Sequence, residues 1–173
     1  ADHISKTFEG RTVLNDISVE FDTGKTNLII GRSGSGKTVL LKSLVGLHDV
    51  DSGKIYYDDT CYTDLNFRER KLIRKDIGMI FQGGALLASS TVRENVRLPL
   101  DLFTRLSEGE KRDRVDFCLE RVRLTGADHL YPSELSGGMV KRVAIARAIV
   151  LNPRYLFCDE PNSGLDPQTS VVI

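Results

Sequence analysis

Apolar residues along the chain recur at two spacings, and segments of the two kinds alternate. Short apolar or alternating runs, the pattern of β-strands, occupy residues 17–21, 26–30, 54–57, 77–81 and 155–158. Longer segments with an apolar residue at every third or fourth position, the pattern of helices, occupy residues 37–46, 68–75, 91–98, 107–124 and 138–151. This alternation predicts an α/β protein with a largely parallel sheet.

Three of the predicted strands differ in how much of each is expected to be buried. Residues 26–30 and 77–81 form apolar runs, which predict strands that are covered on both faces. Residues 17–21 alternate between apolar and polar side chains, which predicts a strand with one exposed face.

Between residues 83 and 134 the pattern is helical, without a predicted strand. A helix that begins at Thr91 is expected to end at Pro99, because a proline ring disfavours a helix interior. The next helix is expected to begin at Ser107, because Glu110 lies at the spacing of a capping box. Helices that interrupt an alternating β/α pattern predict a helical subdomain inserted into the α/β body.

Composition narrows the classes of protein to consider. The 173 residues are enough for one domain, and 28% charged with 40% hydrophobic residues is ordinary for a globular chain. The 24 basic and 24 acidic residues balance, which removes the expectation of nucleic acid as a partner. No apolar run approaches the ~18 residues needed to span a bilayer. Cys61, Cys118 and Cys158 form no CxxC pair, which favours a reducing, cytoplasmic compartment.

Residues 31–38 have the pattern GxxxxGK[ST] of a phosphate-binding P-loop. Its members are Gly31, Arg32, Ser33, Gly34, Ser35, Gly36, Lys37 and Thr38. The glycines let backbone N–H groups face phosphate oxygens at the positive end of the following helix. Lys37 is expected to reach the β- and γ-phosphates, and the Thr38 hydroxyl to ligate Mg²⁺. A glycine-rich turn that only caps a helix is disfavoured by the apolar run before the loop.

An acidic pair follows the last predicted strand. Asp159 and Glu160 come where the strand ends, and Pro161 marks the turn that lets both side chains serve one site. Asp159 suits a role in holding Mg²⁺, directly or through water, and Glu160 is left to polarise an attacking water. The alternative, two solvated acids at a strand end, is disfavoured by the P-loop in the same chain.

A second glycine-rich segment precedes the last predicted helix. Its residues are Leu135, Ser136, Gly137, Gly138 and Met139, and they resemble the LSGGQ signature of ATP-binding-cassette (ABC) ATPases, with Met139 in place of glutamine. The serine and glycines also make a second anion-binding helix N-terminus. P-loop, signature and acidic strand end follow one another in the order of that family, and the resemblance covers essentially the whole chain.

The resemblance implies the fold and its division. It implies an α/β P-loop NTPase (RecA-like) core with a mainly parallel sheet, an antiparallel β N-terminal part and an inserted helical subdomain. Residues 1–82 and 152–173 would form the core, and residues 83–151 the helical subdomain with the signature. The whole of residues 1–173 would be one nucleotide-binding domain that is incomplete at its C-terminus.

The resemblance also implies further site residues. Gln82 resembles the Q-loop glutamine, which touches Mg²⁺ or water and links to the helical subdomain. Asp166 belongs to a segment that resembles the D-loop at the dimer interface. Phe8 resembles the aromatic residue that stacks on adenine, with a core phenylalanine as the alternative. ATP and Mg²⁺ are the implied cofactors, and a second copy, head to tail, is implied to place Ser136, Gly137 and Gly138 on its neighbour's ATP.

One feature of the family is expected to be missing. Family members continue past the D-loop to a switch histidine that contacts the γ-phosphate, and none of His3, His48 and His129 lies at the matching place. We therefore expect this sequence to bind ATP and to turn it over poorly by itself.

Within the family, the segments around Gln82, Asn95 and Ser136 look most like the ATPase of Mla-type (maintenance of lipid asymmetry) systems. That likeness implies phospholipid transport, an inner-membrane permease docked on the segment from Ala85 to Pro99, an MCE-domain protein reached through the permease, and a peripheral place on the cytoplasmic side of the membrane. Charge reversal at Arg93 or Arg97 is expected to uncouple ATP hydrolysis from transport without harming nucleotide binding.

A P-loop kinase would not explain residues 135–139 or Glu160, and three other kinds of ABC ATPase are the further alternatives. The ATPase of an amino-acid or drug transporter is the nearest. An ABC ATPase of chromosome maintenance or DNA repair would need coiled-coil arms, for which the segment between Gln82 and Leu135 is too short. A translation-factor ABC protein carries two cassettes, and one is seen here.

Overall fold

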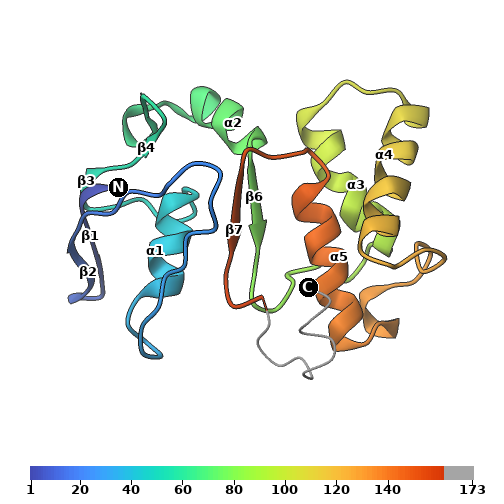
Figure 1. Cartoon of the computed structure of the whole chain (residues 1–173), viewed down its shortest axis with the longest axis horizontal. Helices are drawn as coiled ribbons and strands as arrows, with labels where there is room; N and C mark the ends of the chain where they lie inside the picture. The colour runs from blue at the N-terminus through green and yellow to red at the C-terminus, as the bar shows by residue number, and fades with distance from the viewer. Residues whose placement is uncertain (162–173) are drawn as a thin grey trace. The chain divides into compact units, whose positions relative to one another are not determined.

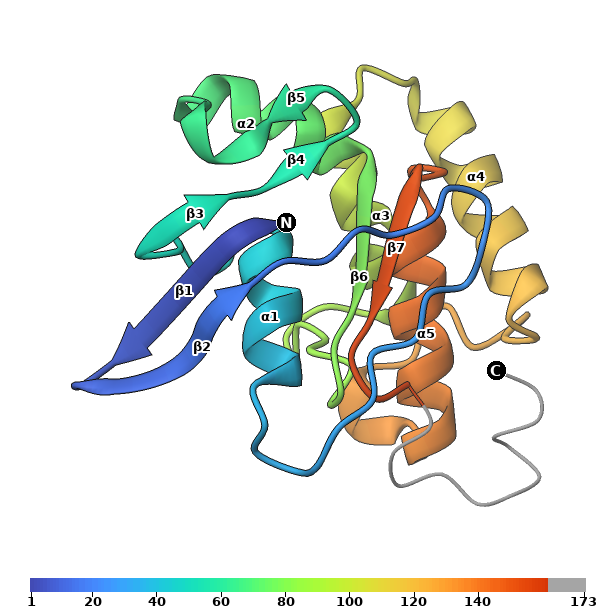
Figure 2. The same ribbon diagram turned by 60° about the vertical axis from the view of Figure 1, so that its left-hand side comes forward.

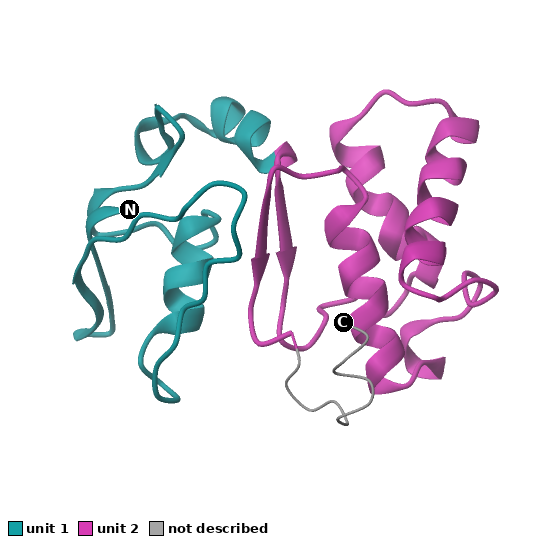
Figure 3. Ribbon diagram, in the orientation of Figure 1, with its two compact units in different colours: residues 1–74 teal, residues 75–173 magenta. Residues whose placement is uncertain are grey.

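The computed structural model describes residues 1–161 and divides into two compact units, residues 1–74 and residues 75–173 (Figure 3). The boundary falls inside helix α2, and we describe each unit by itself. The expected division had instead separated residues 83–151 from the rest. Among the described residues, no helix combines the length and the apolar character needed to cross a membrane.

Unit 1 is built on an antiparallel sheet with strand order β2-β1-β3 (Figures 1 and 2). Its elements are β1 (Asp2–Phe8), β2 (Arg11–Ile17), α1 (Lys37–Leu44), β3 (Ser52–Lys54), β4 (Tyr56–Tyr57), β5 (Thr60–Cys61), the 3₁₀ helix η1 (Tyr62–Asp64) and α2 (Phe67–Lys75). Strands β4 and β5 form a separate antiparallel pair. The expected antiparallel N-terminal part is confirmed, and the strand expected at residues 54–57 is divided between β3 and β4.

The core of unit 1 joins the sheet to α1 and η1. Its buried side chains include Ile4 and Leu14 from the sheet, Leu44 from α1, and Tyr57 and Tyr62 from the segment that follows. The Tyr57 hydroxyl donates a hydrogen bond of 2.9 Å to the Leu44 carbonyl oxygen, so a buried polar atom is satisfied at the end of α1.

Unit 2 contains one parallel strand pair and three long helices (Figure 1). Its described elements are β6 (Ile77–Ile80), α3 (Val92–Phe103), α4 (Glu108–Arg121), the 3₁₀ helix η2 (Pro132–Glu134), α5 (Gly137–Ile149) and β7 (Tyr155–Cys158). In the ladder Ile77 lies opposite Tyr155 and Ile80 opposite Cys158. Within residues 1–161, parallel pairing is limited to β6 and β7, and the other strand pairs are antiparallel.

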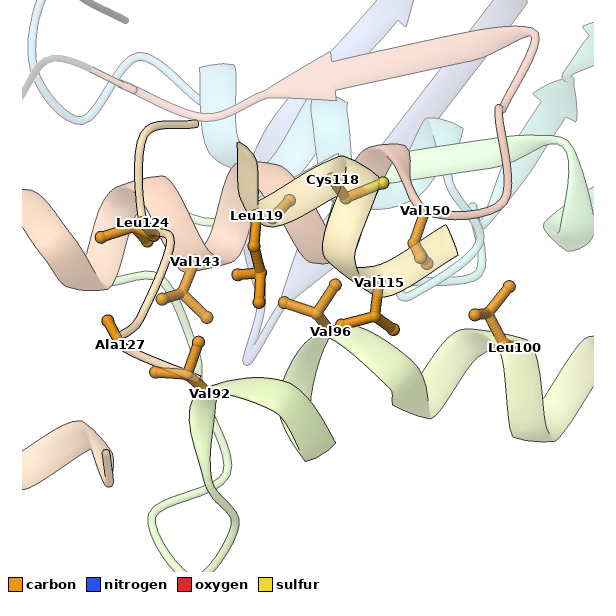
Figure 4. Packing of buried hydrophobic residues seen from close by; sticks show 11 residues of the cluster. Val92, Val96, Leu100, Val115, Cys118, Leu119, Leu124, Ala127, Val143 and Val150 are labelled. Carbon is orange, nitrogen blue, oxygen red and sulfur yellow. The ribbon is translucent and has the colours of Figure 1, made fainter. Parts of the chain in front are cut away.

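The three helices of unit 2 pack around one apolar cluster (Figure 4). Its members are Val92, Val96 and Leu100 of α3, Val115, Cys118 and Leu119 of α4, Leu124 and Ala127 of the following loop, and Val143, Ala146 and Val150 of α5 and its C-terminal end. The apolar face predicted for α4 is confirmed, as is its capping box, in which Ser107 and Glu110 each accept from the other's backbone N–H. This shared core supports the prediction that the helices form a subdomain.

Proline does not end α3 where the sequence predicted. The helix continues through Pro99 to Phe103. Pro99 donates no hydrogen bond to the residue four positions earlier, but burial of Val96 and Leu100 on one helix face holds the segment helical. Tertiary packing therefore outweighs the local preference here.

Two predicted strands are also wrong. The strand expected at residues 17–21 is absent beyond Ile17, the last residue of β2, because the turn after Phe8 pairs Phe8 with Arg11 and places β2 earlier. No strand forms at residues 26–30 either, and Leu28 and Ile30 are 81% and 82% exposed. An apolar run favours burial but does not supply a neighbouring strand, and a strand exists only through such pairing.

Candidate nucleotide site

The P-loop of unit 1 is an exposed segment that leads directly into α1. Gly36 is the N-cap of α1 and has φ of 93°, in the left-handed region that favours glycine. A Cβ atom at this position would also lie 3.1 Å from the Val13 carbonyl oxygen. Both observations explain why the loop requires glycine immediately before Lys37.

The Lys37 side chain folds back over its own loop. Its Nζ donates hydrogen bonds of 3.0 Å to the carbonyl oxygens of Gly31 and Arg32. Both acceptors are neutral, so these bonds orient the ammonium group without cancelling its charge. Thr38 follows in the first turn of α1 and is half-buried. A cation and a hydroxyl thus lie side by side at the positive end of a helix.

Phe8 ends β1 in the same unit and is 37% exposed. Its ring meets His48 edge to face at a centroid distance of 5.3 Å, and the Lys6 Nζ lies 5.4 Å from the ring centroid. Phe8 is therefore not a core residue, as the alternative interpretation had it, and its exposure leaves the expected adenine contact open as a proposal.

In unit 2, the two acidic residues lie at the end of β7 with different surroundings. Asp159 is 4% exposed, and its N–H donates to the Ile80 carbonyl oxygen at 2.9 Å, which extends the ladder by one residue. Glu160 is exposed and has φ of 49°, an uncommon value for a residue other than glycine. The chain thus turns directly after Asp159, at the position where the sequence predicted a strand end.

Gln82 lies beside Glu160. The Gln82 Nε2 donates a hydrogen bond of 2.9 Å to the Glu160 Oε2. The register explains this pairing, because Ile80 lies opposite Cys158 and both residues come two positions later on parallel strands. The structure therefore brings together two of the predicted site residues from segments far apart in the sequence.

Arg147 of α5 holds the loop that follows Gln82, and sequence analysis did not predict this role. Its guanidinium donates hydrogen bonds of 2.7 Å to the Gly84 carbonyl oxygen and 2.8 Å to that of Ala85. Burial lowers the pKa of Arg147 from its ordinary value. Gly84 has φ of 77°, and a Cβ atom there would lie 2.8 Å from Cγ1 of Val140 on the same helix. The one sign in the sequence is that Arg147 interrupts the apolar helix at residues 138–151.

The signature segment forms the N-terminus of α5. Ser136 is the N-cap, and its hydroxyl accepts a hydrogen bond of 3.3 Å from the Met139 backbone N–H. Ser136 and Gly137 are exposed, whereas Met139 packs against the helical core. The expected helix N-terminus is present and accessible. Asp166, the other residue expected at a dimer interface, lies outside the described residues.

The two arginines expected to test permease docking face their own subdomain. Arg93 forms ion pairs of 2.7 Å with Asp116 and 3.0 Å with Asp128. The Arg97 Nε pairs with Asp101 at 3.0 Å, and the Arg97 Nη1 pairs with Glu108 at 2.7 Å.

Charge reversal at Arg93 or Arg97 would therefore break ion pairs within the helical subdomain as well as any contact with a partner. That such variants spare nucleotide binding stays a prediction. In the segment from Ala85 to Pro99, the exposed residues are Ala85, Leu87, Ala88, Ser89 and Glu94.

Oxygen donors dominate the set of residues expected near Mg²⁺. Thr38 offers a hydroxyl, Gln82 an amide oxygen and Asp159 a carboxylate, and Mg²⁺ prefers such ligands together with phosphate oxygens. Within residues 1–161, no three His, Cys, Asp or Glu side chains gather into a metal-binding group.

Comparison with known sequences identifies the family of this chain. Residues 14–163 match the ABC transporter family. The chain belongs to this family. It is 40% identical over 164 residues to the "Probable ribonucleotide transport ATP-binding protein mkl" of Mycobacterium leprae, and 44% identical over 162 residues to the "Methionine import ATP-binding protein MetN" of Geobacillus kaustophilus. These matches cover 95% and 94% of the chain and 47% of each relative, so the chain spans about half the length of the curated relatives it matches.

Solved structures of ABC proteins have the same fold. The dimeric ATP-binding cassette MJ0796, described as a post-hydrolysis state bound to ADP and Pi, matches with a TM-score of 0.92 and 35% identity over 99% of this chain and 78% of that one. The cbiO1 protein of Clostridium perfringens matches with a TM-score of 0.83 and 30% identity over 98% of this chain and 68% of that one. The fold class predicted from the sequence is confirmed, with both parallel and antiparallel sheets.

Proposed function

We propose that this chain is the ATP-binding and ATP-hydrolysing part of an ABC transporter subunit. The observation that carries the proposal is the pairing of Gln82 with Glu160 at the carboxyl ends of β6 and β7, in a chain that also has a complete P-loop. Glycines, one lysine, one hydroxyl and two carboxylates are the groups that bind and cleave a nucleoside triphosphate in P-loop proteins.

Each residue has a distinct proposed role in binding. The backbone of residues 31–36 cradles the phosphates, the Lys37 ammonium meets the β- and γ-phosphates, and the Phe8 ring stacks on adenine. Thr38, Gln82 and Asp159 would hold Mg²⁺. When bound, Mg²⁺ offsets negative charge on the phosphate oxygens.

For hydrolysis, Glu160 is the proposed general base. Its exposed carboxylate accepts a proton from water as that water attacks the γ-phosphorus. The bond between the γ-phosphorus and the oxygen that bridges it to the β-phosphorus breaks in the same step, and ADP and inorganic phosphate are the products. The Gln82 amide donates to one Glu160 oxygen and so orients the other oxygen toward the water. Lys37 remains bonded to the phosphates during the reaction and stabilises their charge.

A second copy of the chain is proposed to complete the site. The exposed N-terminus of α5, with Ser136, Gly137 and Gly138, would bind the γ-phosphate held by the P-loop of the other copy, and Asp166 would lie at the same interface. Two copies related by a two-fold axis can satisfy both phosphate-binding elements of each chain.

The exposed part of the segment from Ala85 to Pro99 is proposed to dock on a transmembrane permease. Its exposed residues are Ala85, Leu87, Ala88, Ser89 and Glu94. This places the protein on the cytoplasmic side of the inner membrane, held there by the permease.

The proposed cargo is phospholipid, with an MCE-domain protein as a further component. The support is the likeness of the segments around Gln82, Asn95 and Ser136 to Mla-type ATPases. The names of the relatives point to ribonucleotide and methionine transport instead. Reconstitution with the permease encoded beside the gene, followed by uptake of labelled phospholipid, methionine and ribonucleotide, decides among the three.

Nucleotide binding is tested by titration with a fluorescent ATP analogue. We expect Lys37→Ala to weaken binding strongly because the charge on the phosphates is lost, and Phe8→Ala to cost roughly 1–3 kcal/mol of stacking. Lys42→Ala on the same helix serves as the control, since it removes a charge away from the loop. Unchanged affinity in both Lys37→Ala and Phe8→Ala would contradict the proposal.

A further inference from the structure

The side chain of Asn95 is completely buried in the helical subdomain, with 0% exposure. It lies on α3 between Val92 and Val96, both of which belong to the apolar cluster. Burying an amide costs free energy unless each of its polar atoms is hydrogen-bonded. Asn95 therefore has to make its hydrogen bonds inside the protein.

All hydrogen bonds of the Asn95 amide go to one short segment. Its Oδ1 accepts a bond of 2.7 Å from the Leu87 N–H, and its Nδ2 donates to the carbonyl oxygens of Leu87 at 3.1 Å, Ser90 at 3.0 Å and Thr91 at 3.0 Å. Both backbone groups of Leu87 are thus paired with a single side chain, in the way that a neighbouring strand would pair them. One buried residue fixes the path of residues 87–91.

The Leu87 side chain points the other way. It is 45% exposed, whereas the preceding Leu86 packs against the apolar cluster. Arg147 holds the backbone just before this pair, at Gly84 and Ala85. An exposed leucine is ordinary on a flexible loop, but here its backbone is held from inside on both sides.

The segment that contains Leu87 carries no charged side chain from residue 83 to residue 90. Residues 83–90 contain only glycine, alanine, leucine and serine, in a chain in which 28% of residues are charged. Ala85, Ala88 and Ser89 are exposed beside Leu87. Small uncharged neighbours around one leucine are complementary to an apolar, uncharged pocket, and charged surfaces would be desolvated there without a partner.

We propose that Asn95 is a positioning residue that presents Leu87 as the anchor of the permease contact. The proposal rests on the docking of the permease stated above, and it adds that the partner surface is an apolar pocket for Leu87. Because the loop is already ordered, docking does not have to order it, and the affinity gains accordingly.

The test uses the permease encoded beside the gene, in nanodiscs of phosphatidylethanolamine and phosphatidylglycerol, and measures its Kd for the ATPase. Leu87→Ser should weaken binding by at least about tenfold, as truncation of a hot-spot side chain does. Leu102→Ser is the matched control, because Leu102 is an exposed leucine on α3 outside residues 83–90. Both variants should keep the ATP affinity and the basal turnover of the unaltered protein.

Asn95→Asp keeps the shape of the side chain and replaces the donor group with an oxygen that faces three carbonyls. We expect it to weaken permease binding about as much as Leu87→Ser. The double variant should bind about as well as either single variant, because both changes remove one contact. Additive losses in the double variant would overturn the proposal, since a residue with a general structural role would act independently of Leu87.

If Asn95→Asp does not fold, hydrogen exchange in the unaltered protein decides its role. The Leu87 amide should exchange as slowly as the core amides of α3, and exchange at the rate of an open loop would overturn the proposal.

A further variant separates this inference from the proposed docking. Ala88→Glu places a charge in the uncharged surface and should block the permease. If Ala88→Glu blocks binding and Leu87→Ser does not, the anchor role is wrong and the docking site stands. If neither affects a permease that binds the unaltered protein, the docking site itself is wrong, and with it the inference.

Discussion

Glu160 combines two local features that favour a reactive position. Its φ of 49° is a conformation that a residue other than glycine adopts at a cost, and its carboxylate accepts the hydrogen bond from Gln82. The neighbouring Asp159 is buried and continues the strand ladder instead. One step along the backbone thus separates an exposed carboxylate that can meet water from a buried one.

Replacing Glu160 with glutamine should stop turnover and preserve binding. The amide keeps the size of the side chain but cannot take a proton, so we expect kcat to fall by about 10²–10⁴-fold with little change in ATP affinity. Phosphate release and nucleotide titration measure the two quantities. Glu120→Gln, an exposed change on α4, should alter neither. Turnover near the unaltered rate in Glu160→Gln would rule out the general base.

Arg147 should matter for stability as well as for the site. Arg147→Met keeps the apolar stem and leaves the Gly84 and Ala85 carbonyl oxygens without their donor. We expect a loss of about 1–3 kcal/mol in the free energy of unfolding, mainly because the buried Gly84 would lose the donor to its carbonyl oxygen. Urea unfolding measures it, with Arg112→Met as the exposed control. Equal stability of the two variants would show that water replaces the guanidinium.

Among the secondary-structure elements, α4 and α5 are tied together at their ends by arginines. Arg114 of α4 donates to the carbonyl oxygens of Val150 at 2.7 Å and Ile149 at 3.1 Å, at the C-terminus of α5. Arg142 of α5 donates to the Arg123 carbonyl oxygen at 3.1 Å, just beyond the C-terminus of α4. Each helix therefore supplies a cation to the negative end of the other.

Removing one of these caps should destabilise both helices. For Arg114→Met we expect a loss of about 1.5–3 kcal/mol, the usual value for hydrogen bonds to a charged group. The signal to follow is helical circular dichroism during thermal unfolding. Arg114→Lys should recover part of the loss, because a lysine can reach one carbonyl but not two. Full recovery by lysine would mean that charge alone matters.

Helix boundaries were the part of the fold best predicted from the sequence. Ser107 and Glu110 form a capping box within four residues, and this motif marks the start of α4 without any tertiary contact. Pro99 gave the opposite result, because the packing of Val96 and Leu100 holds α3 together beyond it. For residues 26–30 the apolar run was correctly seen, but strand formation depends on a neighbour that the run does not specify.

The same division applies to the candidate site. Lys37 and Glu160 were predicted because each belongs to a short motif whose residue types indicate its chemistry. Lys37 belongs to the P-loop, and Glu160 to the acidic pair at a strand end. Arg147 was missed because it donates to backbone carbonyl oxygens 62 and 63 residues earlier, and the hydrogen bonds of Asn95 were missed because they depend on the folded path of the loop before α3. No pattern of neighbouring residues encodes such contacts.

At the scale of the whole molecule, the chain carries no net charge, and its helical subdomain holds a network of ion pairs. Hydrogen bonds from Lys111 and Arg97 lower the pKa of Asp101, and a hydrogen bond from Arg97 lowers that of Glu108. Arg93 lowers the pKa of Asp128 in the same way. Each of these carboxylates is thus stabilised in its charged form by folding.

Acid should therefore destabilise this subdomain. Because the unfolded carboxyls bind protons at a higher pH than the folded ones, the stabilisation is complete above their ordinary pKa values of 3.8 and 4.5 and is lost as the pH falls through the lowered values. Urea unfolding between pH 7 and pH 3 measures this, and high salt should flatten the dependence. Stability that rises toward pH 3 would contradict the assignment of these ion pairs.

Formation of the proposed dimer should depend on which nucleotide is bound. In Glu160→Gln, ATP stays bound, so the proposed head-to-tail pair should accumulate and the mass from light scattering should double when ATP is added. ADP should leave the mass unchanged, because it lacks the γ-phosphate that Ser136 would bind. A constant monomer mass with saturating ATP would contradict the shared site.

The rate at which a thiol reagent labels Cys118 would report how often the helical subdomain opens. Cys118 belongs to the cluster in Figure 4 and has 0% exposure, and burial raises the pKa of its thiol, so it reacts only when the helices separate. Cys61 in unit 1 is partly accessible and provides an internal reference for the reagent. The rate at which a thiol probe labels Cys118 therefore counts the openings of the subdomain. The same count, repeated with ATP and with permease, would report how much each partner slows those openings without any engineered label.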